Sequence, residues 1–119
     1  MTPSTATRIA AVVGFLAVSL GAFGAHALRP LLGHNGTTEI WEKAVFYHFI
    51  HGIMLYLLAQ KQPPARWPFW FFLLGILVFC GSLYLLAVTD CLWLGAITPI
   101  GGLCFLAGWA ALFCTARKD

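Results

Sequence analysis

Residues 9–28 read IAAVVGFLAVSLGAFGAHAL, twenty residues in which His26 is the only ionisable side chain. An α-helix of that length rises about 30 Å, which matches the hydrocarbon thickness of a bilayer. Further apolar stretches follow, and the 119-residue chain is 61% hydrophobic and 9% charged. Ordinary soluble domains are about 25% charged. The sequence therefore predicts an integral membrane protein of the all-α class.

The apolar stretches predict four membrane spans within one transmembrane domain that covers the whole chain. The spans are expected at about residues 7–28, 38–60, 67–89 and 98–116. The fourth span is ambiguous at Pro99. A helix that starts near Leu92 would be kinked there, whereas a helix capped by Thr98 would begin there. We favour the second interpretation, in which residues 91–97 form an interfacial loop.

The basic residues predict the orientation of these spans. Four spans place five basic residues on one side of the membrane and two on the other. The five are Arg8, Lys61, Arg66, Arg117 and Lys118, and the two are Arg29 and Lys43. Because cytoplasmic loops carry an excess of Lys and Arg, both termini are expected in the cytoplasm. No basic run with interleaved aromatic residues occurs, which excludes a nucleic-acid surface.

A stripe of small residues along the first span predicts close helix packing. Its members recur at spacings of three and four and are Ala10, Gly14, Ala17, Gly21 and Gly24. Small residues let helix backbones approach closely in lipid. We therefore expect a four-helix bundle. An exposed stripe of this kind would also favour a homo-oligomer or a larger membrane complex.

Polar side chains within the predicted spans mark a candidate site. If the second span enters the membrane at Trp41, His48 lies about 10 Å deep and His51 about 15 Å deep. Ionisable residues at such depth are functional candidates by default. The predicted ligand-binding set is His26, Glu42, His48, His51, Ser82, Tyr84 and Thr98.

Four interpretations of this polar cluster stay open from the residues. In the first, the histidines hydrogen-bond across helices, and the protein is a scaffold or an assembly factor. In the second, the head group of a lipid or quinone docks on the cluster. In the third, the cluster relays protons or admits a small polar solute, with Glu42 at its entrance. In the fourth, His26, His48 and His51 bind a metal or haem, although no carboxylate or thiolate is placed to complete the ligand shell.

The residues do not predict an enzyme. A hydrolytic triad would need Ser82, a histidine and Asp90, but no strained nucleophile turn precedes Ser82. No phosphate-binding glycine loop occurs, because Gly101 and Gly102 follow a proline inside a predicted span. The four cysteines show neither a C-x-x-C pair nor metal-finger spacing. We therefore expect no enzymatic activity and no cofactor.

Several motifs together resemble one family of small membrane proteins. In chain order they are GAFGAHALR at 21–29, Trp41 with Ala44-Val45 and Tyr47 leading to His51, GSLY at 81–84, LGAITPIGG at 94–102, and Gly108-Trp109. This pattern resembles the domain-of-unknown-function 423 family, which includes eukaryotic transmembrane protein 256, over nearly the whole chain. The resemblance implies a multi-span α-helical protein of the bacterial inner membrane, and it implies no function.

The same resemblance bears on individual site residues. It implies histidine at positions 26 and 51, where this chain has His26 and His51. The family usually has glutamine at position 48 and serine at position 80, so His48 and Cys80 depart from it. A hydrogen-bonded pair of His26 and His51 therefore fits the family better than a site of three histidines.

We therefore expect a bundle with a polar pocket that opens outward and is centred on His26 and His51. The expected function is non-enzymatic. The protein would be a small membrane scaffold or accessory protein that holds an amphiphile, such as a membrane lipid, or packs against larger partners. The alternative is a proton or small-solute conduit that uses the same two histidines.

Overall fold

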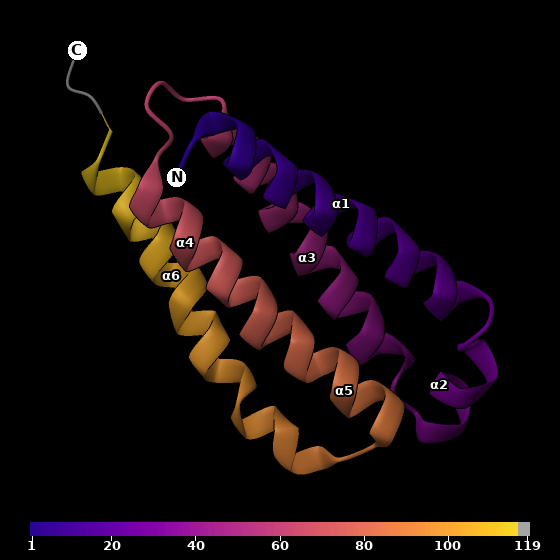
Figure 1. Cartoon of the computed structure of the whole chain (residues 1–119). Helices are drawn as coiled ribbons and strands as arrows, with labels where there is room; N and C mark the ends of the chain where they lie inside the picture. Colours follow the sequence, from indigo (N-terminus) through magenta and orange to yellow (C-terminus); the bar gives the residue numbers. More distant parts are fainter. Residues whose placement is uncertain (117–119) are drawn as a thin grey trace.

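The structure is a computed structural model that describes residues 1–116 and is built almost entirely of helix (Figure 1). In chain order the elements are α1 (Pro3–Ala25), α2 (Arg29–Asn35), α3 (Thr38–Ala59), α4 (Arg66–Gly75), the π-helical η1 (Ile76–Cys80), α5 (Gly81–Thr89), the 3₁₀ helix η2 (Leu92–Ala96) and α6 (Thr98–Cys114). These residues contain no strand. The prediction of an all-α protein is confirmed.

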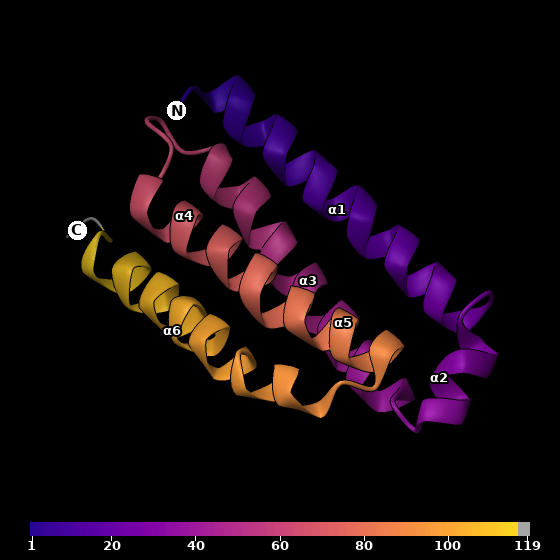
Figure 2. The same ribbon diagram turned by 60° about the horizontal axis from the view of Figure 1, so that its bottom comes forward.

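The long helices run side by side along a molecule 52 Å long and 25 by 22 Å across. α4, η1 and α5 follow one another as a single rod, and this rod packs against α3. α1 packs along the other side of α3, and α6 packs along α4 and η1 (Figures 1 and 2). The described residues show no extended contact between α1 and α6. α3 and the α4–α5 rod are therefore central, and α1 and α6 are peripheral.

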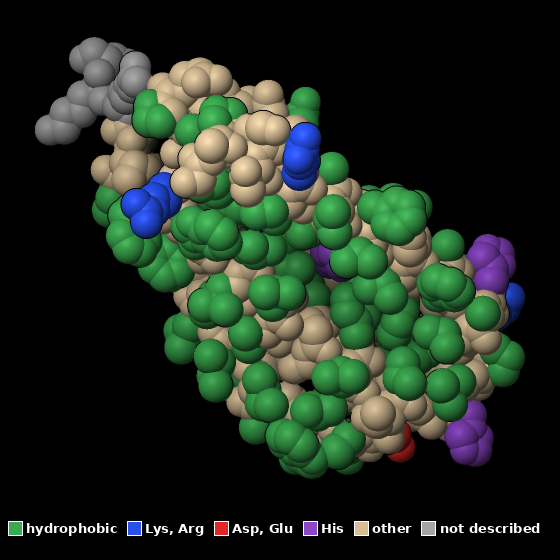
Figure 3. Space-filling view, viewed as in Figure 1, with side chains coloured by type: hydrophobic (Ala, Val, Ile, Leu, Met, Phe, Trp, Pro, Cys, Tyr) green, Lys and Arg blue, Asp and Glu red, His purple; other side chains and the backbone are tan. Residues whose placement is uncertain are grey.

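Within residues 1–116, three helical stretches are long and apolar enough to cross a bilayer, namely Pro3–Ala25, Arg66–Thr89 and Leu92–Cys114. In Arg66–Thr89, 44% of the apolar segment is buried, against 17% in each of the two other stretches. Large apolar side chains therefore cover the outside, as the space-filling view shows (Figure 3). α3 is 22 residues long, but its acidic residues, Lys43 and histidines make it more polar than the other three.

Glycines set the close approach of α6 to the α4–α5 rod. A Cβ atom at Gly101 would meet the backbone of Phe79, and one at Gly75 would meet the ring of Phe105. Gly108 likewise lies against an aromatic ring of α4. Small residues thus bring these helices together, as expected of packing in lipid.

The turn between α1 and α3 contains a helix that the sequence analysis did not predict. α1 ends at Ala25 rather than near residue 28, and Pro30 lies in the first turn of α2. Proline fits there because the first amides of a helix have no intrahelical acceptor. α2 ends at Asn35 and is capped by Gly36, whose φ of 68° is a left-handed conformation that glycine adopts readily.

α2 and the start of α3 also cap the end of α5. Thr37 Oγ1 donates a buried hydrogen bond of 2.7 Å to the Ala87 carbonyl. The Asn35 amide donates to the carbonyls of Ala87 and Val88 at 3.1 and 3.2 Å. The last carbonyls of a helix lack intrahelical donors, so these side chains supply what α5 needs at its end.

The ambiguity at Pro99 is resolved by the start of α6. α6 begins at Thr98 with Pro99 in its first turn, as the favoured interpretation predicted. Ile97, rather than Thr98, is the capping residue. Most of the preceding stretch, expected as a loop, is the 3₁₀ helix η2.

The two ends of the molecule differ in charge. The N-terminus, the α3–α4 connection and the end of α6 lie at one end, here called the basic end, and α2 and η2 lie at the other, the α2 end (Figures 1 and 2). The charged residues of the basic end are Arg8, Lys61 and Arg66; those toward the α2 end are Arg29, Glu39, Glu42, Lys43 and Asp90. Lys and Arg side chains gather mainly at the basic end of the face in Figure 3. Arg117 and Lys118, also used to predict the orientation, lie outside the described residues.

Candidate functional site

His48 is buried on α3 and connects three helices. Its Nε2 lies 2.9 Å from the Val13 carbonyl oxygen of α1, and its Nδ1 lies 2.9 Å from the Tyr84 hydroxyl of α5. A carbonyl only accepts, so Nε2 carries the hydrogen and donates to Val13. In the neutral ring Nδ1 then accepts from the Tyr84 O–H. One imidazole therefore joins α1, α3 and α5.

His51, one turn further along α3, connects this helix to α6. Its Nδ1 donates to the Tyr47 carbonyl at 2.9 Å, and its Nε2 accepts from the Trp109 indole N–H at 3.2 Å. The imidazole also stacks on Phe105, with ring centroids 3.8 Å apart and planes 14° apart. His51 thus has the opposite tautomer to His48, because its backbone acceptor faces the other ring nitrogen.

The sequence of α3 places both rings on its buried face. Positions 48 and 51 are three residues apart, so they lie on the same side of a helix. Gly52 shares this face, and a Cβ there would come within 3.2 Å of the Val13 side chain. The glycine therefore allows α1 to approach α3 at the height of His48, which brings the Val13 carbonyl within reach.

This arrangement engages all four ring nitrogens of the buried pair within the protein. Neither ring has a free lone pair for a metal, and neither has a free N–H to pass on a proton. In residues 1–116, no three His, Cys, Asp or Glu side chains are grouped to hold a metal ion. The chemistry that the pair performs as built is hydrogen bonding between helices.

His26 does not take part in this pair. The predicted contact between His26 and His51 is absent, because both nitrogens of His51 have other partners. α1 ends at Ala25, which leaves His26 exposed at the α2 end. His51 lies thirteen residues into α3, or about 20 Å from that end. Hence His26, His48 and His51, the predicted metal set, do not converge.

Glu42 is exposed and lies apart from both buried histidines. It lines a groove of about 160 Å³ between α1, α2 and α3, together with Gly21, Gly24, Trp41 and other residues, none of them a histidine. The Trp41 indole N–H donates to the Leu20 carbonyl at 2.9 Å, so the indole serves to join α1 to α3. The predicted outward pocket is therefore reduced to a small groove without imidazoles.

The remaining predicted site residues form separate pairs. Tyr84 bonds to His48, as described, and its ring packs on Trp41 with centroids 4.7 Å apart. Ser82 and Thr98 share a hydrogen bond of 2.7 Å between their hydroxyls, which joins α5 to α6. No buried side-chain nitrogen or oxygen among the described residues lacks a hydrogen-bond partner.

Sequence reasoning missed the partners of the buried rings. Trp109 carried a usable signal, because it lies four residues after Phe105 on α6 and a tryptophan that faces a neighbour needs an acceptor for its N–H. The Val13 and Tyr47 carbonyls carried none, because every residue has a backbone carbonyl. Only the packing of α1 on α3 selects Val13.

Comparisons with known proteins point to one family. Residues 20–102 match the model of a family described as "Protein of unknown function (DUF423)". A UPF0382 membrane protein of Staphylococcus haemolyticus is 41% identical, and the match covers 92% of this chain and 93% of that protein. UPF0382 membrane protein YwdK of Bacillus subtilis is 38% identical over 92% of this chain and 94% of its own length. No solved structure matches this chain significantly.

Proposed function

This chain belongs to the DUF423 family, and similar bacterial proteins carry the name UPF0382 membrane protein. We propose that it is a small non-enzymatic membrane scaffold held together by its buried histidines. The observation that carries the proposal is the complete use of the His48 and His51 nitrogens in bonds to other residues. A metal site, a proton path or acid–base chemistry that used these imidazoles would need at least one of their nitrogens to be free.

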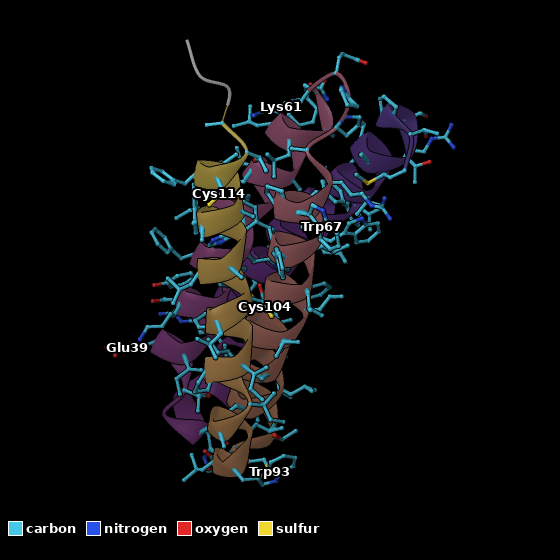
Figure 4. All side chains as sticks on the ribbon, turned by 90° about the vertical axis from the view of Figure 1, so that its left-hand side faces the viewer. Glu39, Lys61, Trp67, Trp93, Cys104 and Cys114 are labelled. Atoms are coloured by element: carbon cyan, nitrogen blue, oxygen red, sulfur yellow. The ribbon has the colours of Figure 1, made fainter. Side chains whose placement is uncertain are left out.

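We further propose that α3 is a fourth span and that both termini are cytoplasmic, in the inner membrane of a bacterium. At 22 residues, α3 is long enough to cross a bilayer, and neighbouring helices cover its two histidines. Trp67 lies toward the basic end and Trp93 lies at the opposite end (Figure 4). Tryptophans are enriched at the two membrane–water interfaces, so these positions fit a molecule that spans the bilayer along its length. The positive-inside rule then favours a cytoplasmic basic end.

As a scaffold, the protein offers its peripheral helices to the membrane. Phe15 on α1 and Phe113 on α6 are 71% and 83% exposed, and other large apolar side chains surround them. These surfaces would contact lipid, a second copy of the chain or a larger membrane protein. An amphiphile of the kind expected from the sequence would use the groove beside Glu42, since the imidazoles are already engaged.

The test compares stability and transport in the same variants. We expect His48→Ala and His51→Ala to lower the melting temperature in detergent, because each leaves buried polar groups without a partner. His48→Gln should largely restore it, since a glutamine amide both donates and accepts. His26→Ala serves as the matched control and should melt like the wild type, because His26 is exposed.

Transport is measured with the same proteins in liposomes that contain a pH-sensitive dye. The scaffold proposal predicts that wild-type liposomes leak protons no faster than empty ones. A proton flux that the wild type supports and a folded His51→Ala variant lacks would establish the conduit instead and end the scaffold proposal.

A further inference from the structure

A second cavity lies at the basic end, far from the histidines. Its volume is about 630 Å³, within the range of about 300–1,000 Å³ typical of small-molecule sites. It is lined by residues 61–65 of the α3–α4 connection, by residues 66–68 in the first turn of α4, and by Thr115 and Ala116 after α6. In Figure 4, Lys61 of the connection and Trp67 of α4 lie toward the same end as Cys114 of α6.

The side chains around this cavity are basic. Lys61 and Arg66 both line it and are exposed. The Arg66 guanidinium lies 5.9 Å from the centre of the Trp67 ring, a cation–π distance that keeps the charge beside the indole. The acidic residues that the structure describes, Glu39, Glu42 and Asp90, are not among its lining residues and lie toward the other end. A ligand of this cavity should therefore carry negative charge.

The cavity also lies where a membrane surface would be. Trp67 is 63% exposed at the start of the span Arg66–Thr89, a position typical of an interfacial tryptophan. Below it, exposed apolar side chains such as Leu74 and Phe113 continue along α4 and α6. Basic pockets between membrane helices are suited to the head groups of anionic lipids. A ligand with a charged head and long apolar chains fits both parts of this surface.

We propose that this cavity binds the head group of an anionic phospholipid. The lipid phosphate lies between Lys61 and Arg66, where the guanidinium donates two hydrogen bonds and the ammonium supplies a point charge. The acyl chains follow the exposed apolar sides of α4 and α6. The site is independent of the proposed scaffold function, because it involves neither buried histidine.

The experiment measures lipid binding to the purified full-length chain by native mass spectrometry. Phosphatidylglycerol is titrated against phosphatidylcholine with the same acyl chains. We expect tighter binding of phosphatidylglycerol, and we expect the double variant K61Q/R66Q to weaken it about tenfold or more, since hydrogen bonds to charged groups are lost. The matched control R29Q/K43Q removes one Arg and one Lys from the other end and should bind like the wild type.

Equal affinity for the two lipids, or an equal loss in both double variants, would overturn the proposal. Inorganic phosphate is a third probe, and binding as tight as that of phosphatidylglycerol would assign the cavity to free phosphate instead. A second measurement uses tryptophan quenching by lipids with brominated chains. Brominated phosphatidylglycerol should quench more than brominated phosphatidylcholine, and this difference should disappear in Trp67→Phe.

Discussion

His48 and His51 show how a polar side chain is accommodated among packed helices. An unpaired polar group buried away from water costs up to several kcal/mol, so each ring must find a donor and an acceptor inside the protein. Both rings donate to a backbone carbonyl oxygen. Such an oxygen has two lone pairs, so it can accept from an imidazole as well as from the helical N–H. Both accept from an aromatic side chain, Tyr84 or Trp109. The backbone carbonyl therefore fixes the tautomer of each ring, and the aromatic partner satisfies the other nitrogen.

The bond between His51 and Trp109 can be tested on its own by a double-mutant cycle. Trp109→Phe removes the indole N–H and keeps an aromatic ring, and His51→Leu removes the acceptor. We expect a coupling free energy of about 0.6 kcal/mol, with an upper limit of about 1.7 kcal/mol, as for other hydrogen bonds between membrane helices. The measurement is the free energy of unfolding in detergent micelles.

Trp93→Phe is the control for this cycle. Trp93 is 65% exposed on η2, so its substitution should leave the stability unchanged and show no coupling to His51. Additive effects of His51→Leu and Trp109→Phe would mean that the bond contributes nothing to stability.

Residue by residue, the sequence predicts the position of a side chain on its helix better than its partner. The helical period places His48 and His51 on one side of α3, and that side is buried in the structure. The same reasoning failed for His26, because α1 stops one residue before it and the side chain is no longer held on the helix face. Whether two side chains meet depends on helix ends and on the heights at which helices cross, and neither follows from local periodicity.

At the scale of elements, the contact of α6 with η1 depends on a single glycine. A Cβ atom at Gly101 would collide with the backbone of Phe79, which cannot move aside as a flexible side chain can. At the neighbouring Gly102, the Cβ would lie 3.9 Å from the Phe79 ring, an ordinary contact. The two positions therefore form a matched pair.

We expect Gly101→Ala to destabilise the protein by about 1–3 kcal/mol, the usual cost of overpacking. Gly102→Ala should be neutral or stabilising by up to about 1 kcal/mol, because alanine reduces the freedom of the unfolded chain and is the better helix former. Thermal unfolding of both variants in the same detergent decides the matter. Equal stability of the two variants would contradict the close approach of α6 to η1.

The elements also show which signals in a sequence are decisive. Long apolar stretches predicted where α1, the α4–α5 rod and α6 lie, because bilayer thickness fixes the length that such a stretch needs. α2 was missed because a helix of seven residues is too short to show a period. Pro30 gives no clear signal either, because a proline can follow the end of one helix or lie in the first turn of the next, as it does here.

For the whole molecule, the distribution of polar groups sets the proposed fourth span, α3, apart from the other three. α1, the α4–α5 rod and η2–α6 are apolar enough to insert independently, whereas α3 has its histidines on the face that other helices cover. Its polarity is therefore tolerated only in the assembled protein. The proposal that α3 crosses the membrane therefore rests on its packing against the other helices, because its hydropathy alone does not identify it as a span.

Single cysteines can test this four-span topology. In a variant without the four native cysteines, Ser4→Cys, Gly33→Cys and Gln62→Cys place one thiol in the first turn of α1, one in α2 and one between α3 and α4. All three positions are exposed, and a Cβ at Gly33 meets no atom within 4 Å. An impermeant maleimide should label Gly33→Cys in bacterial cells whose cell envelope is permeable to the reagent but whose inner membrane is intact. It should label the other two only after the inner membrane is permeabilised.

The labelling pattern distinguishes the possible topologies, because each span moves the following segment of the chain to the other side of the membrane. If α3 does not cross, Gly33→Cys and Gln62→Cys must react alike, and the fourth span is refuted. If Ser4→Cys and Gln62→Cys react in intact cells while Gly33→Cys does not, the four spans stand and the orientation is inverted. In that case the Lys and Arg of the basic end would face outward, against the bias that normally retains such residues in the cytoplasm.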